Sequence, residues 1–179
     1  MTRPITVALW LVCVVASQCL AGQVHVNART TDSSQTRQLK TNSASDNVHE
    51  LMLIAVNAER AAAGRPPLCI NKKLQAAAQQ HSDDMANNNF MSHTGSNGST
   101  MSNRITAQDF GWSAIAENVA AGQVDVASVV KSWMSSDGHK ANILGDYKFF
   151  GMGYAFCTSS TYKHYWTQDF ATGANEVCG

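Results

Sequence analysis

Three histidines and one glutamate carry side chains that could bind a metal ion or transfer protons: His93, Glu117, His139 and His164. They lie in four separate segments, MSHTG, AENVAAG, SDGHKANIL and KHYWTQDF. Imidazole and carboxylate groups build zinc sites, usually with three protein ligands and a water. A histidine–glutamate pair could equally transfer protons near neutral pH. Buried carboxylates are also commonly held in structural hydrogen-bond networks, so the residue types alone leave all three roles open.

The usual signatures of hydrolases and nucleotide-binding proteins are absent from the sequence. It contains no His-Glu-x-x-His, no Gly-x-Ser-x-Gly, no phosphate-binding loop and no Cys-x-x-Cys. The formal net charge is +0, and charged residues make up 15% of the chain, compared with about 25% in ordinary domains. Without a basic patch, the sequence argues against a nucleic-acid partner.

The N-terminus has the pattern of a secretory signal peptide over residues 1–21. Arg3 supplies the positive start, residues 5–16 form an apolar stretch, and Cys19-Leu20-Ala21 reads as a small-x-small cleavage site. The apolar stretch is shorter than the roughly 20 residues that cross a bilayer. We therefore expect cleavage after Ala21 and a secreted, extracellular protein with no stable membrane anchor.

Three cysteines remain after the predicted cleavage: Cys69, Cys157 and Cys178. An odd number in an oxidising compartment predicts one disulfide. The pairing Cys157–Cys178 is preferred because both residues lie near the C-terminus, although Cys69 could pair with either of them. Three cysteines are too few for a disulfide scaffold, so the hydrophobic core must supply most of the stability.

The composition divides the mature chain into a polar linker, residues 22–47, and one domain, residues 48–179. Capping residues and apolar spacing predict helices over 48–63, 71–87, 101–110 and 125–136. Aromatic-rich stretches at 149–157 and 162–171 predict a terminal hairpin, and 113–121 reads as a strand or an extended segment. Helices with antiparallel strands in one small domain give an α+β class.

Two further polar residues stand out beside the main set. His81 falls on an apolar helix stripe with Leu74, Ala77, Ala78 and Met85, so a hydrogen-bonded core histidine is the simplest interpretation. Asn97-Gly98-Ser99 is an acceptor sequence for N-glycosylation on a predicted loop. Asn-Gly is equally a turn dipeptide in its own right, so an unmodified turn remains the alternative.

The order of the motifs SDDMANNNFMSHTG, AENVAAG, GHKANIL, FGMGYA and YWTQDF closely resembles the CAP family of cysteine-rich secretory proteins, antigen 5 and plant pathogenesis-related group-one proteins. The match is nearest to the cysteine-poor branch of bacteria, fungi and oomycetes, and it covers residues 48–171. This resemblance implies an α-β-α sandwich with a large central cleft.

The resemblance also assigns roles to individual residues. His93 matches the first cleft histidine, Glu117 matches the glutamate of the Gly-Glu-Asn motif, and His139 matches the histidine of the GHKANIL block. Ser136 stands near the place where plant and animal members carry a second glutamate. In HYWTQ one extra residue separates His164 from Thr167, which predicts that His164 points to the other face of its strand and makes it a doubtful member of the cleft.

Two functions from different classes follow. The favoured one is a secreted, non-enzymatic binding protein for a lipid, a sterol or a peptide, with a defence- or virulence-related role as an effector. Its cleft would contain His93, Glu117 and His139, with His93 and His139 as candidate ligands of zinc or another divalent cation. The alternative is a zinc-dependent, protease-like hydrolase in which Glu117 or a second acid activates water.

The absence of hydrolase motifs favours the binding protein, and the protein is expected to be a monomer. A third alternative is that these polar residues only brace the cleft through hydrogen bonds.

Overall fold

The computed structural model describes the backbone of residues 33–179 and the side chains from residue 47 onward. The predicted signal peptide, residues 1–21, lies outside the described residues, as do residues 22–32 of the predicted linker. No helix within 33–179 is long and apolar enough to cross a membrane.

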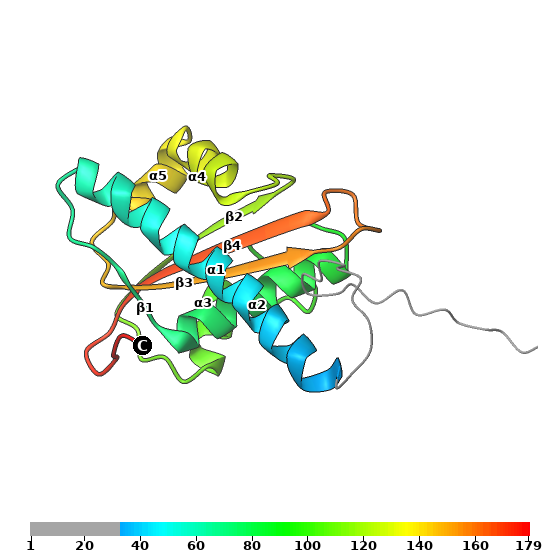
Figure 1. Ribbon diagram of the computed structural model, residues 1–179. Helices are drawn as coiled ribbons and strands as arrows, with labels where there is room; N and C mark the ends of the chain where they lie inside the picture. The colour runs from blue at the N-terminus through cyan, green and yellow to red at the C-terminus, as the bar shows by residue number, and fades with distance from the viewer. Residues whose placement is uncertain (1–32) are drawn as a thin grey trace, which may run out of the picture.

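Five helices and four strands make up the described chain (Figure 1). In chain order they are α1 (Ser33–Ala62), β1 (Cys69–Ile70), α2 (Lys72–Asn87), α3 (Met101–Ala107), β2 (Ala114–Ala121), α4 (Val126–Met134), α5 (Asp137–Ile143), β3 (Phe149–Phe156) and β4 (His164–Thr172). The strands form one sheet in the order β1-β3-β4-β2. β3 and β4 form the predicted antiparallel hairpin, β2 pairs antiparallel with β4, and β1 pairs parallel with β3.

The sheet lies between two layers of helices, which confirms the expected α+β class and the α-β-α sandwich (Figure 1). Successive residues of a strand point to opposite faces. On one face Phe150, Met152, Trp166 and Phe170 pack with Met52 and Val56 of α1 and with Val129, Val130 and Trp133 of α4. On the other face Phe149 and Ala171 pack with Leu74 and Ala77 of α2 and with Ile105 of α3.

Local capping sets the starts of three helices. The side chain of Asn71 accepts hydrogen bonds from the backbone N–H groups of Lys73 and Leu74 at the start of α2. Thr100 and Asp125 form capping boxes at the starts of α3 and α4. The predicted starts of the second and fourth helices are therefore confirmed. Helix α1 begins at Ser33, earlier than the predicted residue 48.

Helix α5 was not predicted, because Gly138 and the short length of the segment conceal its helical pattern. Tertiary contacts stabilise it. Ile143 is fully buried, and Arg60 of α1 donates from Nη1 to the carbonyl oxygens of Ile143 at 2.7 Å and Gly145 at 2.9 Å. The Nε atom of Arg60 also donates to the carbonyl of Pro66 at 2.8 Å. A buried guanidinium on α1 thus positions the helix that carries His139.

Two glycines in β3 allow α2 to lie directly on the sheet. A Cβ atom added at Gly151 would approach the backbone carbon of Leu74 to 2.2 Å, and one at Gly153 would approach the backbone oxygen of Ala78 to 2.3 Å. Real Cβ atoms essentially never come so close, so neither position tolerates a side chain unless α2 moves. This contact fixes the helix from which His81, Ser82 and Asp84 project.

The predicted disulfide pairing is wrong. Cys178 is bonded to Cys69, not to Cys157, with a Cα–Cα distance of 5.6 Å. The C-terminal tail runs back to β1, where Asn71 donates from Nδ2 to the carbonyl of Val177 at 2.9 Å and the N–H of Gly179 donates to the carbonyl of Ile70 at 3.0 Å. Proximity in sequence could not reveal this return, because the tail is placed by tertiary contacts.

We expect Gly153→Ala to destabilise the protein by about 1–3 kcal/mol, because the new methyl group overpacks the contact between β3 and α2. Denaturant unfolding measures this change. Gly138→Ala is the control, since a Cβ atom there has nothing within 4 Å. Equal stability of the wild type and Gly153→Ala would show that α2 can shift freely.

Reduction of the Cys69–Cys178 bond, which spans 109 residues, is expected to lower the free energy of unfolding by about 2–5 kcal/mol. Cys178→Ser should reproduce the loss. Peptide mapping under non-reducing conditions checks the pairing directly. A peptide that joins Cys178 to Cys157 would contradict the structure.

Candidate functional site

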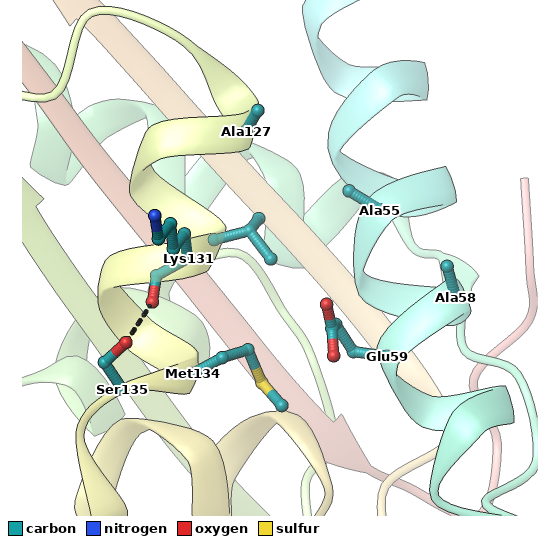
Figure 2. A pocket seen from close by; sticks show the side chains of 8 residues that line it. Ala55, Ala58, Glu59, Ala127, Lys131, Met134 and Ser135 are labelled. Atoms are coloured by element: carbon teal, nitrogen blue, oxygen red, sulfur yellow. Dashed lines mark hydrogen bonds between the residues drawn. The ribbon is translucent and has the colours of Figure 1, made fainter.

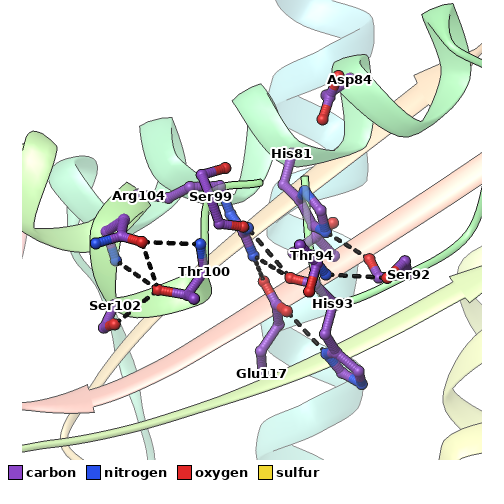
Figure 3. A network of polar contacts seen from close by, with 12 residues as sticks. His81, Asp84, Ser92, His93, Thr94, Ser99, Thr100, Ser102, Arg104 and Glu117 are labelled. Carbon is purple, nitrogen blue, oxygen red and sulfur yellow. Dashed lines mark hydrogen bonds and ion pairs between the residues drawn. The ribbon is translucent and has the colours of Figure 1, made fainter. Parts of the chain in front are cut away.

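A buried carboxylate, Glu117 of β2, lies at the centre of a polar network (Figure 3). Its Oε1 atom is 2.8 Å from Nδ1 of His93, and its Oε2 atom accepts a hydrogen bond of 2.5 Å from Nη2 of Arg104. The side chains of Glu117 and Arg104 are 2% and 4% exposed, whereas that of His93 is 59% exposed. The network therefore links a buried ion pair to an imidazole at the surface.

Arg104 also holds the loop that carries His93. Its Nη1 atom donates to the backbone carbonyls of His93 at 3.2 Å and Ser99 at 3.0 Å. From α2, the ring of fully buried His81 donates through Nε2 to the carbonyl of Ser92 at 2.8 Å. His81 thus lies in the core, as its position on the apolar stripe predicted, and also fixes the loop directly before His93.

Asp84 of α2 anchors the next part of the same loop. Its Oδ2 atom accepts from the backbone N–H of Ser96 at 2.8 Å, and its Oδ1 atom accepts from the Ser96 hydroxyl at 2.5 Å. Asn97 is exposed on this loop, and its Oδ1 atom accepts from the N–H of Ser99 at 2.9 Å. The predicted turn is therefore present, and the glycosylation of Asn97 stays a prediction.

The charges within the network shift the pKa values of its members in opposite directions. A hydrogen bond to Glu117, and the charge of that carboxylate, raise the pKa of His93 despite its partial burial. Burial raises the pKa of Glu117, but the hydrogen bond from His93 and the positive charge of Arg104 outweigh it, and the net shift is downward. At neutral pH Glu117 is accordingly an anion that favours protonated His93.

His139 reaches the network from the opposite face of the sheet. Asn142 of α5 donates from Nδ2 to the backbone carbonyl of Glu117 at 3.1 Å and to Oδ1 of Asn118 at 2.9 Å. Asn118 in turn donates from Nδ2 to the carbonyl of His139 at 3.2 Å. Nδ1 of His139 contacts the hydroxyl of Ser136 at 2.9 Å, and burial and then the charge of His93 lower the pKa of His139.

His164 is not part of this group. It pairs with Phe156 at the end of the hairpin where the 157–163 loop connects β3 to β4. Its Nδ1 atom lies 2.9 Å from the hydroxyl of Tyr154. Glu117 pairs with Asp169 across β2 and β4, so the two-residue alternation places His164 on the opposite face of the sheet from Glu117. The structure brings His93 and Glu117 into contact, holds His139 beside them through Asn118, and leaves His164 apart.

The donor atoms of the network do not fit a zinc site. Both oxygens of Glu117 are engaged, by His93 and Arg104, and the Nδ1 atom of each of His93 and His139 already has a partner. Only the two Nε2 atoms remain for an ion, whereas open zinc sites use three protein ligands. Over the part of the chain that the structure describes, no group of three or more His, Cys, Asp or Glu side chains could hold a metal ion.

Sequence reasoning assigned no role to two residues that complete the network. Arg104 lies on α3 next to buried Ile105, and Asp169 of β4 is fully buried opposite Glu117. Arg104 is one of several polar residues in its short helix, and nothing in the local sequence indicates that it pairs with Glu117. For Asp169, the one available signal is an acidic residue inside an aromatic-rich strand, which is unusual because unpaired Asp residues are almost never fully buried.

A comparison with family models matches residues 53–170 to the cysteine-rich secretory protein family, CAP. This matched region contains His93, Glu117, His139, Arg104 and Asp169. The chain belongs to the CAP family. The resemblance predicted from the order of the sequence motifs is thereby confirmed.

The chain is similar in sequence or in fold to several bacterial proteins. The Bacillus subtilis protein YkwD is 30% identical over 156 residues, which are 87% of this chain and 57% of YkwD. The chain thus spans little more than half the length of that relative. The fold of this chain is similar to that of an extracellular protein with an SCP domain from Bacillus anthracis. The TM-score is 0.62 at 23% identity, and the match covers 80% of this chain and 45% of the other.

Two further solved structures share the CAP fold of this chain. An outer surface protein of Borrelia burgdorferi has a TM-score of 0.62 at 19% identity, with 80% of this chain and 97% of that one covered. Venom allergen-like protein 4 of Schistosoma mansoni has a TM-score of 0.50 at 15% identity, with 72% and 90% covered. At such identities these likenesses show the fold alone.

Removing either partner of the buried ion pair is expected to cost about 3–5 kcal/mol, because the other charge is left buried without a partner. Glu117→Gln and Arg104→Met test this expectation by denaturant unfolding. The double variant should lose less than the sum of the two single losses. Lys73→Met breaks the more exposed Lys73–Glu176 pair and should cost under about 1 kcal/mol. Strictly additive losses at Arg104 and Glu117 would contradict a direct pairing.

Proposed function

We propose that this CAP-family chain is a secreted, non-enzymatic binding protein that holds an apolar molecule, a lipid or a sterol, in a groove between α1 and α4. The observation that carries the proposal is the groove itself, with a volume of about 400 Å³ (Figure 2). Its apolar lining comes from Ala55, Ala58, Ala127, Val130 and Met134. Small-molecule sites typically range from about 300 to 1,000 Å³ and are lined mainly by apolar side chains.

The groove arises from the small side chains on the facing helices. Ala55 and Ala58 of α1 and Ala127 of α4 are too short to fill the space between the two helix backbones, as Figure 2 shows. Below them, Val130 and the rest of the core layer form a packed, apolar base. Burial of a ligand's apolar surface here would contribute about 25 cal/mol per Å² before the cost of association.

Polar groups at the groove are few, and this favours an amphiphile over a peptide. Glu59, Lys131 and Ser135 are the polar members of the lining. Lys131 offers an ammonium group to a carboxylate or a hydroxyl at one end of a lipid or a sterol. A bound peptide would instead require regular partners for its backbone N–H and C=O groups, which alanine, valine and methionine side chains do not supply.

The polar network has a supporting role in this proposal. His93, Glu117 and His139 are not among the residues that line this groove, so the proposal treats the polar cluster as separate from the ligand site. The oxygens of Glu117 are engaged by His93 and by Arg104, and the ion pair with Arg104 makes this carboxylate a weak base. This arrangement gives no support to the hydrolase alternative. Metal binding by His93 and His139 would need ligands from outside the described chain.

The signal-peptide pattern and the extracellular and outer-surface relatives support a location outside the cell. A carrier of apolar molecules in that location could serve defence or virulence, the roles that the family resemblance suggests. The organism that produces the protein would decide between these two roles.

Ala58→Phe should fill the groove and weaken the binding of a fluorescent fatty acid or sterol at least tenfold. The measurement is a titration of the purified secreted protein with each probe. Ala62→Phe, on the same helix but outside the lining, is the matched control. His93→Ala should leave the affinity unchanged.

Two outcomes would contradict the proposal. One is the absence of saturable binding for both probe classes. The other is binding that survives Ala58→Phe but disappears in His93→Ala, which would assign the ligand to the polar network instead.

A further inference from the structure

Asp169 is the most unusual titratable group among the described residues. It lies in β4, is 0% exposed, and pairs directly with Glu117 of β2. Since paired residues in adjacent strands point to the same face, the two carboxyl groups share one side of the sheet. The groove between α1 and α4 lies on the other side, so Asp169 has no part in the proposed ligand site.

Neither carboxyl oxygen of Asp169 has a hydrogen-bond donor within reach among the described residues. The Nη2 atom of Arg104 donates to Oε2 of Glu117, and the buried Nε atom of Arg104 has no hydrogen-bond partner among the described residues. A buried carboxylate without a donor is very costly, and such a group normally becomes neutral instead. Glu117 lies directly across β2 and β4 from Asp169 on the same side of the sheet, where two ionised carboxylates would repel each other.

Every charged group around the pair leads to the same division of roles. Burial lowers the pKa of His81 of α2 and favours its neutral form, whereas Arg104 of α3 and His93 of the loop each bond to Glu117. These groups hold Glu117 as the anion. Burial and the negative charge of Glu117 raise the pKa of Asp169 well above its ordinary value, although Arg104 opposes this shift.

We propose that Asp169 is a neutral carboxylic acid that donates its proton to Glu117, so that the two side chains form a buried proton-sharing pair. Glu117 then accepts from three donors, namely Asp169, Arg104 and His93. Asp169 is a positioning residue in this arrangement. It supplies a third hydrogen bond to the carboxylate of Glu117 and thereby stabilises the anionic form beneath the surface imidazole of His93. The inference goes beyond the proposed lipid carrier and does not depend on it.

The first test is a carbon-13 NMR titration of the wild-type protein. The carboxyl carbon of Asp169 should ionise only well above the ordinary aspartate pKa of about 3.9, because the folded protein retains its proton. Exposed Asp125 provides the internal comparison, since hydrogen bonds from Ser128 lower its pKa. Ionisation of Asp169 below pH 4 would overturn the proposal, and this readout requires no variant to fold.

The second test compares stability as a function of pH in the wild type and in Asp169→Asn, which retains a donor but cannot ionise. Unfolding releases the proton of Asp169 wherever the pH exceeds the unfolded pKa, about 3.9. The contribution of Asp169 to wild-type stability therefore falls as pH rises from about 4 toward its folded pKa. The folding equilibrium constant of the variant, relative to the wild type, should rise by up to tenfold per pH unit.

Asp125→Asn is the matched control: its carboxyl has a lowered pKa in the folded state, so its curve should diverge from the wild type only below about pH 4 and run parallel above it. Parallel curves for Asp169→Asn and the wild type would overturn the proposal.

The pKa of His93 gives a third, independent readout. Asp169→Asn removes no charge if Asp169 is already neutral, so the imidazole of His93 should titrate as it does in the wild type. Glu117→Gln, in contrast, should lower the pKa of His93 because it removes the anion that raises it. A fall in the pKa of His93 in Asp169→Asn would show that Asp169 carried a negative charge, and would overturn the proposal.

Discussion

The buried charge of Glu117 is the constraint on which the polar half of the molecule depends. A carboxylate that is 2% exposed needs charged or hydrogen-bonding partners, and the chain supplies them from distant segments. Arg104 comes from α3 and His93 from the loop after α2, while Asn142 ties α5 to the backbone of Glu117. Satisfying one charge therefore fixes a helix and a loop at this strand, and the strand's backbone holds a second helix.

The sheet separates this network from the apolar groove. Alternation along β2 points Glu117 toward α2 and α3, whereas Asn118 points toward α5. The groove between α1 and α4 lies on the same side of the sheet as Asn118, where apolar side chains form its base. Two regions of different chemistry thus lie on opposite sides of the sheet and have no residue in common, so substitutions can address each of them separately.

Close packing gives this arrangement its rigidity. Gly151 and Gly153 bring the backbone of α2 against β3, and Arg60 joins the end of α1 to the end of α5. The Cys69–Cys178 disulfide holds the C-terminal tail against β1 at the opposite edge of the sheet from β2. The helices that carry His81 and His139 are consequently fixed by contacts far from the polar network, which keeps its hydrogen-bond geometry constant.

The sequence by itself determined the local elements and the family, because capping residues, apolar spacing and motif order are read along the chain. Asn71, Asp125 and the aromatic hairpin were predictable for that reason, and so was the candidacy of His93 and Glu117. Only the tertiary structure decided the partner of Cys178, the pairing of Arg104 with Glu117 and the burial of Asp169 opposite Glu117. Each of these depends on which segments meet across the sheet, and residues that meet only in space leave no periodic signal in the sequence.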